Sequence, residues 1–193
     1  MSLPFPRRAL IVPGRGETVA DFLAWRTVFD EVSGIDFDDR FARLEFGAQV
    51  AQVSALIAHA HSCNTLVVGR SFGAWLVLHA LLGRTDRFDG TALLLAPVLG
   101  YGGSGHVGFM APRARSFWRN VEDGCPMPAS RVIFVVGLAD VQCPTELARN
   151  LARRWPIEPH EWRIGHVLDA WTSTDVARKV EEVLCCDRST LPP

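Results

Sequence analysis

The stretch "TLVVGRSFGAWLVLHALLG", residues 65–83, joins two apolar segments through a short turn that contains glycine and serine. Residues 65–69 are rich in valine and leucine, which predicts a buried strand. After Ser71 the chain is apolar at almost every position up to Gly83, which predicts a helix that is buried on nearly all sides and ends at that glycine. A buried strand followed at once by a buried helix places this segment at the centre of an α/β structure.

The rest of the chain repeats this alternation of short apolar runs and segments with helical periodicity. We expect strands at residues 8–12, 42–46, 90–97, 131–137 and 160–164, and helices from Thr18 to about Val32, over 47–63, from Pro144, and after Ser173 or Thr174. Right-handed connections between such units predict a doubly wound, mostly parallel sheet of about six strands with helices on both faces. In such a sheet the ligand site lies at the carboxyl ends of the strands.

The length of 193 residues fits one domain over residues 1–193 that buries a core without structural metal. Residues 98–129 are rich in glycine, proline and arginine, which predicts a small excursion or partial cap over one end of the sheet. The apolar run after Arg7 and Arg8 is too short for a signal peptide, and the five cysteines are odd in number and lack zinc-type spacing. A reducing, cytoplasmic location is therefore expected.

The formal net charge of −1 offers no general attraction for nucleic acid or an anionic membrane. We therefore expect a small molecule or a protein as partner, and the sequence sets no oligomeric state. His59, His61 and Cys63 could suggest a metal site. Residues two apart on a helix point in nearly opposite directions, however, so these three converge only if the helix has already ended. We expect no metal ion and no organic cofactor.

The turn itself has the spacing Gly69-x-Ser71-x-Gly73, which is a weak signal as a string and a strong one between a buried strand and a buried helix. Small residues on both sides of Ser71 let the helix approach the strand closely and leave the hydroxyl exposed for chemistry. The alternative is an ordinary glycine-rich turn in which Ser71 only caps the helix. The "GGSGH" at 102–106 lacks this spacing and follows no strand.

A serine nucleophile needs a base and an acid, and candidates for both follow predicted strands. Asp140 comes directly after the strand at 131–137, and His166 lies in the loop after the last strand, next to Gly165. The alternatives are a turn aspartate and a surface histidine without a catalytic role. Two rival aspartates and three rival histidines are less well placed: Asp169, Asp175, His79, His106 and His160.

Acyl transfer also needs N–H donors aimed at the developing oxyanion. We expect the backbone N–H groups of Phe72, at the start of the helix, and Arg15, in the loop after the first strand, to supply them. A phosphate-binding glycine turn is the alternative for the loop, but it lacks the third glycine or the Gly-Lys-Ser sequence of such turns. Four residues of the excursion are candidates for lining an acyl pocket or for packing it down: Phe109, Met110, Phe117 and Trp118.

These residues resemble the α/β-hydrolase superfamily, in particular its compact serine hydrolases that lack a large lid domain. "VGRSFG", "GLADVQCP" and "IGHVLD" resemble its three motif regions, and Ser71, Asp140 and His166 follow its order of nucleophile, acid and base. The resemblance covers nearly the whole chain. The chain departs from the family pattern at Pro13-Gly14, where the family often has His-Gly, and at Arg70. For Arg70 we expect either a surface salt bridge or contact with an anionic substrate.

The resemblance implies that Ser71 attacks an ester-like carbonyl and forms an acyl-enzyme. Water that His166 activates then hydrolyses this acyl-enzyme. The predicted function is a serine hydrolase of carboxylic esters or thioesters with a Ser-His-Asp triad. Peptide or C–C bond hydrolysis uses the same triad, because the fold does not choose the substrate. The alternative from a different class is a non-catalytic, hydrolase-like binding or scaffold protein.

Overall fold

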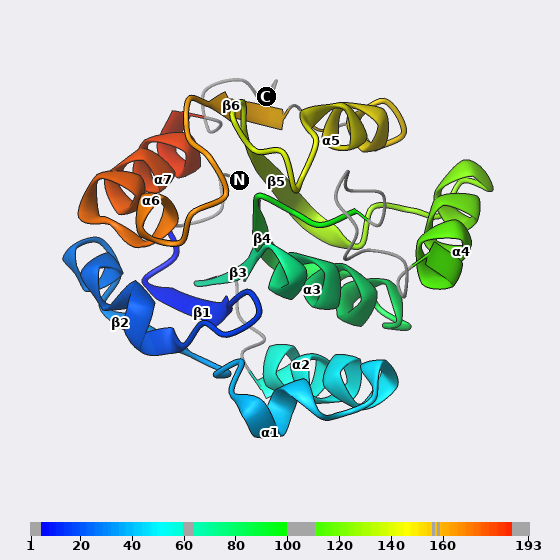
Figure 1. The fold of residues 1–193 in the computed structure, drawn as a ribbon, viewed down its shortest axis with the longest axis horizontal. Coiled ribbons are helices and arrows are strands. Elements are labelled where there is room, and N and C mark those ends of the chain that lie inside the picture. Colours follow the sequence, from blue (N-terminus) through cyan, green and yellow to red (C-terminus); the bar gives the residue numbers. More distant parts are fainter. Residues whose placement is uncertain (1–4, 60–63, 100–110, 156, 158, 187–193) are drawn as a thin grey trace.

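In the computed structural model, residues 5–59, 64–99, 111–155, 157 and 159–186 are described. Six strands within them form one parallel sheet in the order β2-β1-β3-β4-β5-β6 (Figure 1). The strands are β1 (Arg8–Val12), β2 (Glu31–Gly34), β3 (Thr65–Arg70), β4 (Phe88–Leu95), β5 (Ala129–Gly137) and β6 (Pro159–Trp162). The predicted doubly wound parallel sheet is confirmed.

Helices cover both faces of this sheet. One face packs against α1 (Asp39–Ala42), α2 (Phe46–His59), α3 (Phe72–Leu82), α4 (Ala111–Glu122) and α5 (Thr145–Ala152). The other packs against the 3-10 helix η1 (Val19–Thr27), α6 (Asp169–Thr172) and α7 (Thr174–Cys186). Figure 1 shows α6 and α7 on one side of the sheet and α2 to α5 on the other. Within the described ranges, no helix has both the length and the apolar character to cross a bilayer.

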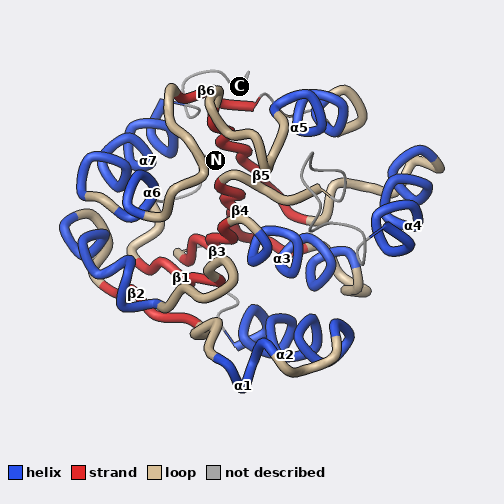
Figure 2. Tube along the Cα trace, in the orientation of Figure 1, coloured by secondary structure: helices blue, strands red, loops and turns tan. Residues whose placement is uncertain are grey.

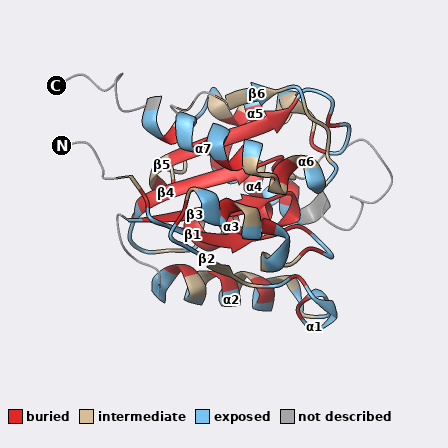
Figure 3. Ribbon diagram, turned by 90° about the vertical axis from the view of Figure 1, so that its left-hand side faces the viewer, coloured by how far each residue is buried: buried red, intermediate tan, exposed pale blue. Residues whose placement is uncertain are grey.

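The centre of the molecule has the predicted structure. All six residues of β3 are buried, and α3 buries every residue except His79 and Leu82. Figure 3 shows the strands and α3 as mostly buried, in contrast to the outer turns of α2. A helix that is buried all round has no amphipathic stripe, so its packing between β3 and its neighbours, and not its periodicity, fixes its place.

The segment between β1 and β3 differs from its prediction. The expected helix up to Val32 ends at Thr27, and the chain then forms the edge strand β2, which pairs with β1. The predicted strand at 42–46 is wrong, because residues 39–42 form α1 and Phe46 begins α2. Phe22, Trp25, Phe29 and Val32 are all buried with a helix-like spacing. That spacing fits one continuous helix as well as it fits the observed short helix followed by a strand.

The described part of the excursion contains a helix that the sequence analysis did not predict. Its helix α4 buries Phe117 and Val121 in the core on the face of the sheet that α3 covers. Proline and several arginines hid this helix, although its buried and exposed residues are well separated along it. Residues 100–110 lie outside the described part of the chain, so the partial cap stays a prediction.

Candidate active site

The turn between β3 and α3 holds Ser71 in an unusual backbone conformation, with φ 53° and ψ −117°. A residue with a Cβ adopts a positive φ only under strain, which the surrounding structure must support. The two flanking glycines show why the turn is possible. A Cβ on Gly69 would lie 2.5 Å from the Ala74 Cα, and one on Gly73 would lie 2.0 Å from the Val12 carbonyl oxygen. The steric reason for these glycines is confirmed.

Backbone hydrogen bonds fix Ser71 against the neighbouring strand. Its N–H donates to the Leu95 carbonyl at 2.9 Å, and its carbonyl accepts from the Val98 N–H at 3.2 Å. Both partners lie at or just beyond the carboxyl end of β4. Ser71 is therefore held through both its backbone N–H and its backbone carbonyl at the carboxyl ends of the strands, where the tan loops gather in Figure 2.

Ser71, His166 and Asp140 form a hydrogen-bonded group that we name the serine cluster. Ser71 Oγ lies 3.0 Å from His166 Nε2, and His166 Nδ1 lies 2.8 Å from Asp140 Oδ2. Ser71 is 7% exposed and Asp140 6% exposed. The three side chains that follow β3, β5 and β6 in sequence thus meet in the order that a nucleophile, base and acid require.

Asp140 and the histidine loop are each anchored by further bonds. The second carboxylate oxygen of Asp140 accepts the backbone N–H groups of Gln142 and Cys143, both at 2.9 Å. The Trp171 indole donates to the Gly165 carbonyl at 2.8 Å, just before His166. These bonds leave Asp140 Oδ2 aimed at the imidazole and hold the loop that carries the imidazole in place.

A second polar group, the arginine cluster, lies beside the first and comprises Gly14, Glu17, Arg70 and the backbone of His166. Arg70 forms a buried ion pair with Glu17 and donates to the His166 carbonyl oxygen. Glu17 also accepts the Gly14 N–H at 2.7 Å. Arg70 and Glu17 are 3% and 5% exposed, so the expected surface position of Arg70 is wrong. It pairs with a carboxylate inside the protein because an unpaired guanidinium would be costly there.

The electrostatics of Arg70 follow from this burial. Burial lowers the pKa of Arg70, and the nearby Cys143 and Asp140 oppose that effect. One polar atom, Nε, has no hydrogen-bond partner among the described residues. The guanidinium is therefore held mainly by Glu17 and the His166 carbonyl, and it connects the loop after β1 with the loop after β6.

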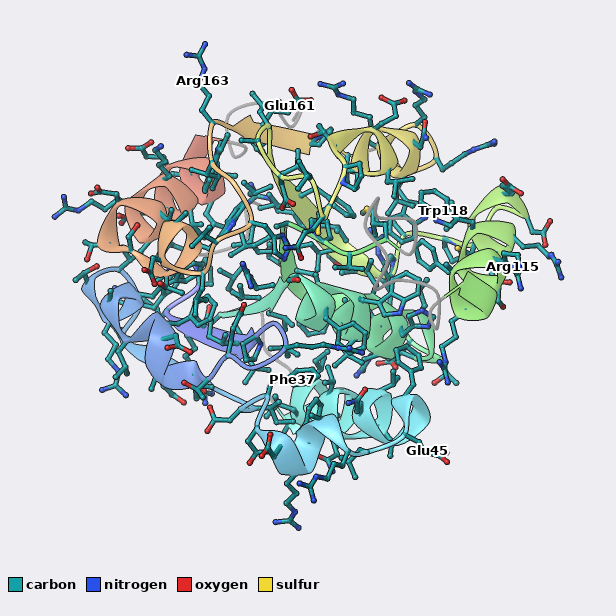
Figure 4. The ribbon with its side chains drawn as sticks, in the orientation of Figure 1. Phe37, Glu45, Arg115, Trp118, Glu161 and Arg163 are labelled. Atoms are coloured by element: carbon teal, nitrogen blue, oxygen red, sulfur yellow. The ribbon has the colours of Figure 1, made fainter. Side chains whose placement is uncertain are left out.

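The side chains of the two residues predicted to supply the oxyanion donors are in contact. Phe72 is the first residue of α3, where a backbone N–H has no partner within the helix. The Arg15 guanidinium stacks over the Phe72 ring at 4.4 Å from its centroid. Phe37 packs against the same ring from another direction, and it is labelled below the centre of Figure 4. The oxyanion role of Phe72 and Arg15 stays a prediction.

The rival acids and bases lie elsewhere. Asp169 begins α6, Asp175 lies in the first turn of α7, and His160 lies in β6. His106 lies outside the described residues, and so do His61 and Cys63, two of the three residues that suggested a metal site. The third, His59, binds the Ala55 carbonyl within its own helix. None of the described rivals contacts Ser71.

His79 lies half-buried among aromatic rings on α3. Its ring packs edge-on against Phe46 and Trp75 at 5.1 and 4.4 Å between centroids. Burial, and to a lesser extent the positive charge of Arg113, lowers the pKa of His79 to about 4. This histidine is therefore neutral near pH 7 and acts as a packing residue.

The pocket candidates fall into two groups. Phe117 packs against Trp75 at 5.0 Å between ring centroids and is 2% exposed, in agreement with a packing role. Trp118, labelled beside α4 in Figure 4, donates its indole N–H to the Leu99 carbonyl and lines a cavity of about 410 Å³ between α4 and α5, together with Glu122 and Leu147. Phe109 and Met110 lie outside the described residues, so their role stays a prediction.

Sequence reasoning missed Glu17 and Cys143. Glu17 lies between Gly16 and the capping box of Thr18 and Asp21, a position typical of an exposed loop acid. Cys143 Sγ lies 3.7 Å from His166 Nδ1, on the same side as Asp140. Cys143 follows Asp140 by three residues, so a turn at Asp140 brings the two side chains to the same place. This short separation was the one sequence signal for the contact between Cys143 and His166.

Comparison with known proteins shows which solved structures share this fold. No protein-family model matches the sequence, and no curated protein matches it. Many solved structures are similar, three of which have TM-scores of 0.64 to 0.67. They are a monoacylglycerol lipase from Paleococcus ferrophilus (16% identity, covering 94% of this chain and 96% of that chain, TM-score 0.65), the ydeN gene product from B. subtilis (13%, 92% and 98%, 0.67) and a lipase-esterase related protein from Clostridium acetobutylicum (12%, 92% and 94%, 0.64).

The similarity extends over nearly the full length of each of these chains. The protein therefore has the α/β-hydrolase fold, in agreement with the resemblance seen in its sequence.

Proposed function

We propose that this protein is a serine hydrolase that cleaves carboxylic esters or thioesters through an acyl-enzyme on Ser71. The observation that carries the proposal is the serine cluster, in which a strained serine, a histidine and a buried aspartate are hydrogen-bonded in sequence. Two of the similar structures are a lipase and a lipase-esterase related protein, and their ester chemistry agrees with this proposal.

In the first half of the reaction, His166 Nε2 takes the proton of Ser71 Oγ while that oxygen attacks the substrate carbonyl carbon. The carbonyl π bond becomes an oxyanion, which the N–H groups of Phe72 and Arg15 stabilise. Asp140 accepts the Nδ1–H of His166 and stabilises the imidazolium that forms. The oxyanion then re-forms the carbonyl, the bond to the alcohol or thiol breaks, and His166 returns its proton to the leaving group.

In the second half, water replaces the leaving group. His166 takes a proton from this water, whose oxygen attacks the acyl carbon, and then protonates Ser71 Oγ as the carboxylic acid leaves. A water molecule is consumed, and the protein returns to its starting protonation. No step needs a metal ion or an organic cofactor.

The contacts favour this proposal over a non-catalytic binding protein. A displaced His166 or a blocked hydroxyl would favour the binding protein, whereas here Ser71 Oγ contacts Nε2 at 3.0 Å. The strain at Ser71 supports the same conclusion, because a turn that serves packing alone gains nothing from a serine at φ 53°.

Labelling with a fluorophosphonate probe tests the proposal. Wild type should be labelled on Ser71, as located by mass spectrometry, and both Ser71→Ala and His166→Ala should abolish labelling. Ser116→Ala, which removes an exposed serine of α4, is the matched control and should be labelled like wild type. Labelling justifies a screen of 4-nitrophenyl esters and acyl thioesters. Failure of the folded wild type to react would contradict the proposal and favour a binding protein.

A further inference from the structure

Cys143 adds a third metal-ligating side chain at the imidazole nitrogen that Asp140 contacts. Cys143 Sγ lies 3.7 Å from His166 Nδ1, and Asp140 Oδ2 lies 2.8 Å from the same nitrogen. The ligating atoms of the three residues all lie within 4.8 Å of one another, and no other such group of three occurs in the described part of the chain. Cys143 is 3% exposed, so its thiol is held in this position by packing.

The spacing fits a tetrahedral ion. Zinc binds sulfur at about 2.3 Å and nitrogen or oxygen at about 2.0–2.2 Å, which separates tetrahedral ligand atoms by about 3.3–3.6 Å. The sulfur-to-nitrogen distance of 3.7 Å lies about 0.1 Å above this range, and the sulfur and oxygen, which are within 4.8 Å of each other, can close to it by small side-chain movements. The Asp140 oxygen and His166 nitrogen would move apart by about half an ångström, a small motion for the half-buried ring. A water molecule would take the fourth position.

We propose that Asp140, Cys143 and His166 form an inhibitory site for zinc or another thiophilic divalent cation. A carboxylate and a thiolate balance the charge of the dication, and neutral imidazole supplies the third ligand. The nearby positive charge of Arg70 opposes binding, but Glu17 pairs with it. Because burial and the Asp140 carboxylate raise the pKa of Cys143 well above its ordinary value, the thiol keeps its proton until the ion displaces it.

Binding changes the tautomer of His166. Because Asp140 Oδ2 lies 2.8 Å from Nδ1, we assign the ring proton in the serine cluster to Nδ1, which leaves Nε2 to accept the Ser71 proton. A metal ion on Nδ1 displaces that proton, and the neutral ring then carries its proton on Nε2. The thiol proton of Cys143 leaves to solvent. With Nε2 protonated, His166 cannot take the Ser71 proton, so the ion inhibits the reaction; this consequence rests on the proposed function.

Cadmium titration tests the site without reference to catalysis. Wild type should develop the ultraviolet charge-transfer band of a cadmium thiolate, and Cys143→Ala and Cys143→Ser should each lose the largest part of it. Cys125→Ala is the matched control, since it removes a half-buried thiol outside this group, and its band should equal that of wild type. An equal band in wild type and both Cys143 variants would overturn the proposal.

Zinc inhibition tests the consequence. Each protein is compared with its own rate in the presence of a chelator, so that differences in basal activity cancel. Zinc should inhibit wild type and Cys125→Ala reversibly, and at least tenfold more zinc should be needed for Cys143→Ala. Equal sensitivity of all three proteins would overturn the inhibitory role. A cadmium band in a protein that the fluorophosphonate does not label would instead contradict the proposed function and leave the metal site standing.

Discussion

The serine cluster and the arginine cluster meet at His166, and each holds a different part of this residue. The serine cluster binds the two ring nitrogens, at 3.0 Å from Ser71 and 2.8 Å from Asp140. The arginine cluster binds the backbone carbonyl through Arg70 and also reaches the Gly14 N–H through Glu17. In the proposed mechanism the serine cluster transfers the protons, whereas the arginine cluster holds the two loops in position.

If the proposed function holds, this difference separates the catalytic residues of the serine cluster from the positioning residues of the arginine cluster. A change in the serine cluster alters the chemistry directly and leaves the fold largely intact. A change in the arginine cluster leaves a buried charge without its partner. It therefore lowers the free energy of unfolding and at the same time displaces the two loops. The two clusters should thus respond differently when activity and unfolding are measured on the same variants.

Asp140→Asn should have the largest effect on the rate. The amide no longer stabilises the imidazolium and favours the wrong tautomer, so kcat should fall about 10³- to 10⁴-fold, while unfolding in urea changes little by comparison. Asp169→Asn, on α6, is the matched control and should retain wild-type kcat. A loss of less than tenfold in Asp140→Asn would remove Asp140 from the proposed triad.

Arg70→Met should affect both measurements. Glu17 would remain buried without its partner, so the free energy of unfolding should fall by about 3–5 kcal/mol. Displacement of the loops should lower kcat/KM about 10- to 100-fold. Arg8→Met breaks the exposed Arg8–Glu31 pair of the same sheet and should change stability by less than about 1 kcal/mol.

The double variant Arg70→Met with Glu17→Gln separates the two effects of this cluster. Without either charge, the free energy of unfolding should recover part of the loss, because no ion is left buried alone. The activity should stay low, because the link between the Gly14 loop and the His166 carbonyl remains broken. Activity that recovered in parallel with stability would show that the arginine cluster acts only on folding.

His79 sharpens the comparison, because it is a half-buried ionisable group that pairs with no carboxylate in the described part of the chain. Its folded pKa of about 4 lies below its ordinary value of 6.5, so the unfolded chain binds more protons between these two pH values. Its contribution to stability is complete above about pH 6.5 and is lost as the pH falls towards 4, by up to about 3 kcal/mol. Urea unfolding of His79→Phe between pH 4 and pH 7 should show a weaker dependence on pH than wild type.

Ser71→Gly should give the smallest effect on stability. Glycine adopts a positive φ without the steric cost that a Cβ brings, so the melting temperature should rise, by the equivalent of about 1 kcal/mol. Ser71→Ala keeps the Cβ and should not show this gain. A melting temperature of Ser71→Gly below that of Ser71→Ala would show that the turn stores little strain.

The sequence predicted the centre of the fold and the residues of the serine cluster for a physical reason. Residues 65–83, 90–97 and 131–137 are continuous apolar runs, and such runs have few alternative places in a structure. Ser71, Asp140 and His166 each follow such a run or the last strand, so the topology alone brings them to one edge. The N-terminal segment failed because its buried residues fit a helix and a helix followed by a strand equally well.

The arginine cluster could not be predicted in the same way. The salt bridge joins Glu17, in the loop after β1, to Arg70, the last residue of β3, and no periodicity links these two residues. Arginine and glutamate side chains are mostly exposed, so neither residue taken alone indicates a buried ion pair. Only the close approach of the loop after β1 to the carboxyl end of β3 makes the pair possible, and that approach is a property of the folded chain.

The outer strands of the sheet have a consequence for the behaviour of the protein at high concentration. Both β2 and β6 are only four residues long, and β6 begins with Pro159, which has no N–H to offer another chain. Charged residues lie along both edges, among them Glu31, Glu161 and Arg163, the last of which points away from the molecule in Figure 4. Such edges give an approaching strand little to pair with, so the sheet is guarded against growth into aggregates from either side.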